Sequence, residues 1–206
     1  MLNNVKHNLY PIIILGAGGH AVSVANVALS AGYKIAYFID ANKKERADIE
    51  RAYETAEKAH LGQSRKSGEE YISHPVAVAQ ILAELGMGSS TIIAALLHDT
   101  VEDTVATMES IEGFFGPEIA KGVWFMTKTP DYVGNRKFRK ELCEMRLREA
   151  PEIIRILKTC DMFHNSLSIE EHDPKFWNTF KEETVSLLIA MDTLEVMGEL
   201  EVLNAK

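Results

Sequence analysis

The chain has 206 residues, enough for one hydrophobic core or for one domain with an appendage. Its residues are 46% hydrophobic and 25% charged, which is typical of a globular protein, and the net charge of -8 argues against a general nucleic-acid-binding protein. The 2 cysteines, Cys143 and Cys160, are too few for a disulfide framework or a cysteine-rich zinc site, and they fit the reducing cytoplasm.

An uncharged stretch near the start raises the question of a targeting segment. No Lys, Arg, Asp or Glu occurs between Lys6 and Lys34, so a signal peptide or a membrane span has to be considered. However, the apolar run Ile12–Leu15 has only the length of a strand, and glycines and polar residues follow it. We therefore expect neither a targeting segment nor contact with a membrane.

The first 44 residues have the pattern of one βαβ unit. Residues 10–15 and 33–39 are expected as strands, and residues 20–31 as the helix between them. The turn after the first strand has the spacing Gly16-x-Gly18-x-x-Ala21, which matches a loose dinucleotide-binding fingerprint. A complete dinucleotide-binding domain needs more than two strands. We therefore predict that residues 1–44 form a short Rossmann-like appendage that binds no cofactor.

The same stretch resembles the N-terminal segment of sugar O-acyltransferases of the sialic-acid and bacillosamine type. The resemblance covers about residues 10–41, and it rests on the run Ile-Leu-Gly-Ala-Gly-Gly-His that ends at His20 and on Phe38-Ile39-Asp40. The remainder of that family's nucleotide-sugar domain and its left-handed β-helix are missing from this sequence, so acyl transfer is not implied.

Residues 45–206 show helical spacing of their apolar residues throughout, so we predict a second, all-α domain there. Pro75 is expected at the first position of one helix, and Ser89 or Ser90 as the cap of the next. Thr107 is expected to cap a short helix. A helix that follows Pro151 should bury Ile153, Ile154, Ile156 and Leu157, and the last helix should run unbroken over about residues 175–197.

The most informative stretch of the second domain is Ile92–Thr104. Six apolar residues in a row predict a helix that is buried on all sides, and this run leads directly into His98 and Asp99. Glu102 and Asp103 follow within one turn. Unpaired charge is unfavourable in a protein interior, so a bound cation explains this pattern better than the alternative, a solvated helix end.

Two further side chains complete a candidate metal site. His74 and Asp161 lie on or beside other apolar helices, so with His98 and Asp99 the sequence offers two imidazoles and two carboxylates. This mixed nitrogen and oxygen set suits Mn²⁺, Fe²⁺ or Zn²⁺ with coordination positions left open for water. Glu102 and Asp103 are placed to orient such a water and to transfer protons.

Over about residues 45–168 the sequence resembles the HD-domain hydrolases of the RelA/SpoT type, which remove the 3′-pyrophosphate from the alarmone ppGpp. The motifs that carry the resemblance are Ala59-His60-x-Gly62-Gln63, Arg65–Glu69, Tyr71-Ile72-x-His74-Pro75, Ala94–Thr104, Phe115-Gly116, Thr127-Lys128, Asp161 and His164-Asn165. In combination these motifs are highly specific. There are two departures: Met162 stands where the family usually has Arg, and Glu70 where Pro is common. We expect both to alter the shape of the nucleotide pocket.

The resemblance implies a role for each matched residue. His74, His98, Asp99 and Asp161 would bind the metal, usually Mn²⁺ in this family, with other divalent metals left open. Glu102 and Asp103 would do the acid–base work. Arg65 and Lys66 would contact the guanine base and nearby phosphates, and Asn165 the sugar. Lys128 is a candidate for the pyrophosphate end, and His60 is interpreted as structural.

The fold class expected from all this is mainly α: an HD-domain helical bundle with a short N-terminal βαβ appendage. The expected function is metal-dependent hydrolysis of (p)ppGpp to GDP or GTP and pyrophosphate, on a small-molecule nucleotide and not on nucleic acid. Two alternatives stay open: hydrolysis of another nucleotide, such as an adenosine alarmone or NADPH, and an alarmone-binding protein without turnover. The sequence leaves the oligomeric state undetermined.

Overall fold

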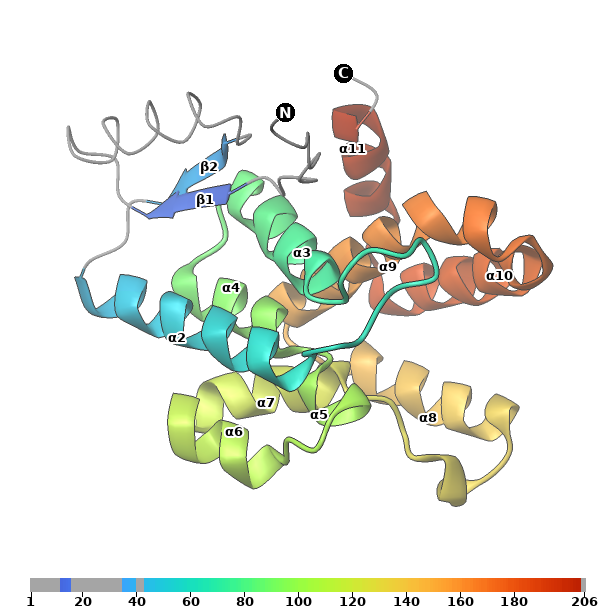
Figure 1. Ribbon diagram of the computed structural model, residues 1–206. Helices are drawn as coiled ribbons and strands as arrows, with labels where there is room; N and C mark the ends of the chain where they lie inside the picture. The colour runs from blue at the N-terminus through green and yellow to red at the C-terminus, as the bar shows by residue number, and fades with distance from the viewer. Residues whose placement is uncertain (1–11, 16–34, 40–42, 205–206) are drawn as a thin grey trace, which may run out of the picture. The chain divides into compact units, whose positions relative to one another are not determined.

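The computed structural model of the chain (Figure 1) describes residues 12–15, 35–39 and 43–204. The chain divides into two compact units, Met1–Ala47 and Asp48–Lys206. Apart from two short strands in the first unit, the described elements are helical, so the prediction of a mainly α protein is confirmed. Among the described residues, no helix is both long and apolar enough to span a membrane.

The first unit contains two parallel strands. They are β1 (Ile12–Leu15) and β2 (Ile35–Ile39), and they pair from Ile12 with Ile35 to Leu15 with Ile39, with one irregularity after Ile12. Isoleucine-rich runs favour strands because the branched side chains suit a pleated surface. The predicted helix over residues 20–31, the glycine-rich turn and Asp40 lie outside the described residues.

The second unit is a bundle of helices (Figure 1). The helices of the chain and one short 3₁₀ segment are α2 (Lys43–Ala59), α3 (Ser73–Glu84), α4 (Ser89–Leu97), α5 (Thr100–Asp103), α6 (Met108–Phe115), α7 (Pro117–Met126), η1 (Asp131–Val133), α8 (Arg136–Arg148), α9 (Glu152–His172), α10 (Pro174–Met191) and α11 (Leu194–Asn204).

Helix α4 is the central helix of this unit. It contacts α3, α7 and α9, and every residue from Thr91 to Leu97 is buried, as its unbroken apolar run predicts. The contact with α7 is close because Gly122 has no side chain: a Cβ there would lie 3.3 Å from the Cβ of Ala94 and 3.4 Å from Cδ1 of Ile154. Helix α4 therefore brings its C-terminal residues, His98 and Asp99, into the middle of the bundle.

The predicted helix starts are partly confirmed. Thr107 caps α6, because its Oγ1 accepts a hydrogen bond from the Ser110 N–H at 3.2 Å while the Ser110 Oγ accepts one from the Thr107 N–H at 3.1 Å. The predicted serine cap of α4 is wrong: Gly88 precedes the helix, and no side chain caps it. Pro75 is the third residue of α3 and not the first, because the helix already begins at Ser73.

The predicted last helix is also wrong, because the chain breaks it into α10 and α11. Asp192 adopts a left-handed conformation (φ 57°), which aspartate tolerates better than most residues. The next residue, Thr193, is buried, and its Oγ1 lies 2.9 Å from the Oγ1 of Thr159 on α9. This contact fixes the turn against α9, so Leu194 leaves the apolar stripe of α10 and is 52% exposed.

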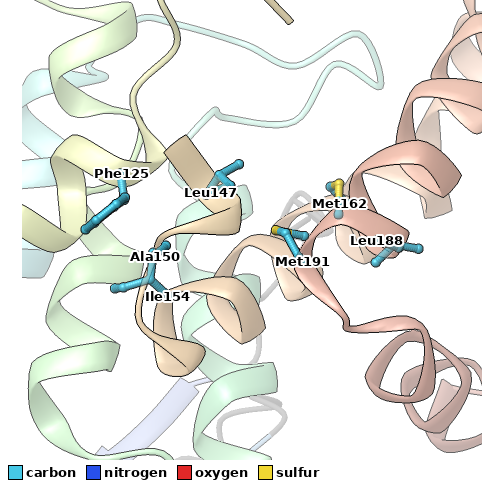
Figure 2. Close-up of a cluster of buried hydrophobic side chains, with 7 residues drawn as sticks. All are labelled: Phe125, Leu147, Ala150, Ile154, Met162, Leu188 and Met191. Atoms are coloured by element: carbon cyan, nitrogen blue, oxygen red, sulfur yellow. The ribbon is translucent and has the colours of Figure 1, made fainter. Parts of the chain in front are cut away.

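A hydrophobic cluster joins the C-terminal helices (Figure 2). It consists of Phe125, Leu147, Ala150, Ile154, Met162, Leu188 and Met191, from α7, α8, α9 and α10 and the turn before α9. Of the residues expected in the core of α9, Ile154 and Leu157 are buried, whereas Ile153 is 40% exposed. Met162 belongs to this cluster, so the departure at this position changes the core and not the lining of the cavity described below.

Candidate metal centre and nucleotide site

Four side chains from three parts of the bundle converge at one point. His74 comes from α3, His98 and Asp99 follow the end of α4, and Asp161 comes from α9. The Nε2 atom of His74 lies 3.0 Å from Oδ1 of Asp161 and 3.6 Å from Oδ2 of Asp99. The Nε2 atom of His98 lies 3.2 Å from Oδ2 of Asp99 and 3.6 Å from Oδ1 of Asp161.

The ligand atoms of His74, His98 and Asp161 all lie within 4.8 Å of one another, and Asp99 is their direct neighbour.

The two imidazole rings present the nitrogen that a metal needs. Nδ1 of His98 donates to the main-chain oxygen of Ala95 at 2.7 Å, so its Nε2 keeps a lone pair. That Nε2 is buried and has no hydrogen-bond partner among the described residues. Nδ1 of His74 lies 2.8 Å from Nδ1 of His164. A buried, unpartnered nitrogen beside two carboxylates fits a bound divalent cation.

The carboxylates of this cluster are held ionised by their neighbours. The Nζ of Lys158 donates to Oδ2 of Asp161 at 2.8 Å, and Nδ2 of Asn165 donates to its Oδ1 at 2.8 Å. Burial alone would raise the pKa of Asp161, but the Lys158 ammonium and the two histidines outweigh it and hold that pKa well below its ordinary value. The pKa of Asp99 is lowered in the same way, by His98 and His74.

The histidines differ in their ease of protonation. Burial lowers the pKa of His74, and burial with the neighbouring His74 lowers that of His164 to about 3. Burial also acts on His98, but there the Asp99 and Asp161 carboxylates outweigh it and raise the pKa well above its ordinary value. Without a cation, a proton on His98 therefore takes the place of positive charge in the cluster.

The two carboxylates predicted to do acid–base work lie one short helix away. Both are on α5, and the structure places them in different surroundings. Oδ2 of Asp103 lies 2.8 Å from the hydroxyl of Tyr71, whose other neighbour is Oδ2 of Asp99 at 2.9 Å. Glu102 is instead bound to Lys128, whose main-chain N–H donates to its Oε2 at 3.0 Å and whose ammonium donates to its Oε1.

A cavity opens beside this cluster. It has a volume of about 230 Å³ and is lined by Ser64, Arg65, Lys66, Tyr71, Ser168, Ile169, His172 and Asp173. Nη2 of Arg65 donates to Oδ1 of Asn165 at 2.8 Å, and Asn165 also binds Asp161, so one amide side chain connects the cavity to the cluster. Lys66 is on the surface and forms an ion pair with Asp173, the residue before α10.

Sequence reasoning missed several residues of this region, among them His164 beside His74 and three others. Tyr71, Lys158 and Asp173 each bind a predicted site residue, yet none was given a role. A signal existed for two of them: Tyr71 belongs to the motif that ends in His74-Pro75, and Lys158 precedes Asp161 by one helical turn. Asp173 follows Lys66 by 107 residues, and no local pattern connects such a pair.

Comparison with protein families assigns both parts of the chain. The HD domain family matches residues 52–141, and the PglD N-terminal domain matches residues 11–80. The two matches overlap over residues 52–80, which contain the second half of α2, the loop after it and most of α3. His74, a member of the cluster, lies in this overlap. The earlier part of the second match agrees with the acyltransferase-like resemblance of residues 10–41.

Curated relatives match most of the chain, but the chain spans only about a fifth of their length. A guanosine-3′,5′-bis(diphosphate) 3′-pyrophosphohydrolase of Aquifex aeolicus is 42% identical over 159 residues, which are 74% of this chain and 21% of that protein. A GTP pyrophosphokinase of Streptomyces coelicolor is 42% identical over 120 residues, 57% of this chain and 14% of that protein.

Two solved structures share the fold. A metazoan ortholog of SpoT, described as hydrolysing ppGpp, superposes with a TM-score of 0.59 at 24% identity over 74% of this chain and 95% of that one. A protein of Listeria monocytogenes superposes with a TM-score of 0.53 at 28% identity over 61% of this chain and 82% of that one. Residues 52–141 therefore match the HD domain, and the resemblance of this chain to HD-domain proteins of the RelA/SpoT type is confirmed.

Proposed function

We propose that this chain is a metal-dependent guanosine-3′,5′-bis(diphosphate) 3′-pyrophosphohydrolase. Water attacks the phosphorus that is bonded to the ribose 3′ oxygen, the bond between them breaks, and pyrophosphate is released together with GDP from ppGpp or GTP from pppGpp. The observation that carries the proposal is the convergence of His74, His98, Asp99 and Asp161 beside the cavity that holds Arg65. The identity of 42% to a relative named for this reaction supports it.

His74, His98, Asp99 and Asp161 are proposed to hold the metal ion, and Mn²⁺ is the ion we expect. A divalent ion bound by them supplies a water of lowered pKa and positive charge next to the attacked phosphoryl group. The protein keeps the four ligands in position. Lys158 and Asn165 orient Asp161, the main-chain oxygen of Ala95 orients His98, and His164 orients His74.

Glu102 and Asp103 are proposed to move the protons of the reaction. One carboxylate takes a proton from the attacking water, and a proton is delivered to the departing 3′ oxygen, so the charges balance. Asp103 is exposed and within reach of Asp99 through Tyr71. Glu102 is paired with Lys128. When Lys128 turns towards a phosphate of the substrate, the Glu102 carboxylate becomes free to accept a proton.

Three cationic residues and one amide are proposed to bind the nucleotide. Arg65 and Lys66 would contact the guanine base and nearby phosphates, Asn165 the sugar, and Lys128 the pyrophosphate end. The position of Asn165 between Arg65 and Asp161 supports this order, because a nucleotide bound in the cavity through Arg65 would have its sugar on the side of the metal ligands. In the ligand-free protein both lysines are paired with acids, so binding exchanges a carboxylate for a phosphate.

Relatives of the same segment carry two activities in their names, hydrolase and pyrophosphokinase. We assign the hydrolase, because the HD domain match covers residues 52–141 and contains three of the four candidate metal ligands, His74, His98 and Asp99. For the domains, we propose that residues 1–44 form a βαβ appendage and residues 45–206 the HD-type domain. The parallel pairing of β1 with β2 supports the first of these, since parallel strands require a crossover connection.

The test is to incubate the metal-stripped full chain with ppGpp, with and without Mn²⁺, and to follow pyrophosphate and GDP. We expect release of both only with Mn²⁺, and none from the His98→Ala variant. The control is Glu118→Ala, at an exposed position of α7 that belongs neither to the metal cluster nor to the lining of the cavity. Binding of ppGpp without release would identify an alarmone-binding protein instead, and release from NADPH or an adenosine alarmone alone would identify another nucleotide as the substrate.

A further inference from the structure

Three residues of the motifs before His74 have no role in the proposed reaction. They are His60, Gln63 and Tyr71, which follow α2 and precede α3. His60 is almost fully buried, at 2% exposure, although it lies outside the metal cluster. Burying an imidazole is costly unless its polar atoms are satisfied, so the contacts of these three residues need an explanation.

Gln63 uses all its polar atoms to hold this segment together. Its side-chain Oε1 accepts a hydrogen bond from Nδ1 of His60 at 2.8 Å, and its main-chain oxygen accepts one from the Tyr71 N–H at 3.0 Å. Its Nε2 donates to the main-chain oxygen of Asp103 at 2.8 Å, across 40 residues of sequence. One amide therefore ties the loop before α3 to the end of α5.

The ring of Tyr71 is fixed on the other side. It stacks on His60 with the ring centroids 4.6 Å apart and an angle of 20° between the planes. This arrangement directs its hydroxyl to two carboxylate oxygens, Oδ2 of Asp99 at 2.9 Å and Oδ2 of Asp103 at 2.8 Å. A phenol has one proton, so it donates to one of them at a time and keeps both within reach.

We propose that Tyr71 is a positioning residue: its hydroxyl holds the Asp103 carboxylate beside the metal-ligand Asp99, while His60 and Gln63 fix Tyr71 and the main chain of Asp103. This inference rests on the proposed function. It gives the buried His60 a purpose, because the stacked ring determines where the Tyr71 hydroxyl points. Removal of a hydrogen bond to a metal ligand typically lowers metal affinity or activity about 10- to 100-fold.

The decisive variant is Tyr71→Phe, which removes the hydroxyl and keeps the stacked ring. We expect kcat for ppGpp to fall about 10- to 100-fold with KM changed less than about 3-fold, and Mn²⁺ to bind about 10-fold more weakly in calorimetry of the full chain. The matched control is Tyr53→Phe, whose hydroxyl also binds a carboxylate, Glu57 at 2.6 Å, but away from the cluster. It should leave kcat and Mn²⁺ affinity unchanged.

A double-mutant cycle then shows whether Tyr71 acts through Asp103. If it does, the kcat of the double variant Tyr71→Phe/Asp103→Asn should lie within about 3-fold of the kcat of Asp103→Asn alone. If the two residues act independently, the losses of kcat caused by the two substitutions should multiply. Gln63→Met provides a second approach if Tyr71→Phe does not fold: it should lower kcat because the main chain of Asp103 loses its anchor. Multiplying effects, or a Tyr71→Phe variant with normal kcat and normal Mn²⁺ affinity, would overturn the proposal.

The Mn²⁺ titration distinguishes a failure of this inference from a failure of the proposed function. If the wild-type chain does not hydrolyse ppGpp, the proposed function fails, but the Mn²⁺ titration still tests the positioning. In that case weaker Mn²⁺ binding by Tyr71→Phe than by both wild type and Tyr53→Phe supports the inference, and equal binding refutes it.

Discussion

The metal cluster and the two lysines proposed to bind the nucleotide are built in opposite ways. His74, His98 and Asp161 are between 1% and 5% exposed, and further hydrogen bonds orient each of them. The side chains of Lys66 and Lys128 are 71% and 68% exposed, and each rests on one carboxylate. The buried cluster therefore suits a small ion that stays bound, whereas weak surface pairs suit the proposed role of the lysines, which would exchange a carboxylate for a phosphate.

The strongest test of this difference is Asp161→Ala. In the metal-free protein the substitution leaves the ammonium of Lys158 in the interior without its carboxylate, and breaking a buried pair from one side costs about 3–5 kcal/mol. We expect a loss of that size in the free energy of unfolding, measured with urea, and a loss of Mn²⁺ binding. Adding Lys158→Met should restore much of the stability but not the metal. Equal stability of the single variant and wild type would show that the pair is not buried.

The second test uses pH. The neighbouring carboxylates raise the pKa of His98 well above its ordinary value in the metal-free protein, and metal binding requires the neutral imidazole. A proton therefore competes with Mn²⁺. As the pH increases towards that pKa, the affinity for Mn²⁺ should increase about tenfold per pH unit, and above that pKa it should become constant. Calorimetry in buffers of different ionisation enthalpy should show about one proton released per ion near neutral pH. Binding without proton release would contradict the raised pKa.

The smallest effect on stability is expected at the surface. Lys66→Ala breaks an exposed pair with Asp173, so the free energy of unfolding should change by less than about 1 kcal/mol. KM for ppGpp should nevertheless rise, with kcat little changed, because Lys66 is proposed to contribute to binding and not to the attack. Asp173→Ala is the informative partner variant: by freeing Lys66 it should lower KM or leave it unchanged. A kcat that falls with either variant would place this pair closer to the reacting phosphorus.

The local features of the helical domain could be read from the sequence. The unbroken apolar run of Ile92–Leu97 predicted a buried helix, and Thr107 predicted the start of α6. Both features follow from interactions within a few residues. The predicted end of the last helix failed for the opposite reason: what stops α10 is the contact of Thr193 with Thr159, 34 residues earlier.

For the candidate site, the sequence specifies which residue types are present and in which motifs: the histidines and carboxylates at 74, 98–99 and 161, and the basic residues at 65 and 66. Which of these residues meet depends on the packing of the helices. It brought Asp161 within 3.0 Å of His74, connected Tyr71 to Asp103, and paired Lys66 with Asp173 and Lys128 with Glu102. These partners lie 26 to 107 residues apart. Helical periodicity determines which side chains are neighbours only within a few turns of one helix. The distances between site residues on different helices depend on the packing of α4 against α3, α7 and α9.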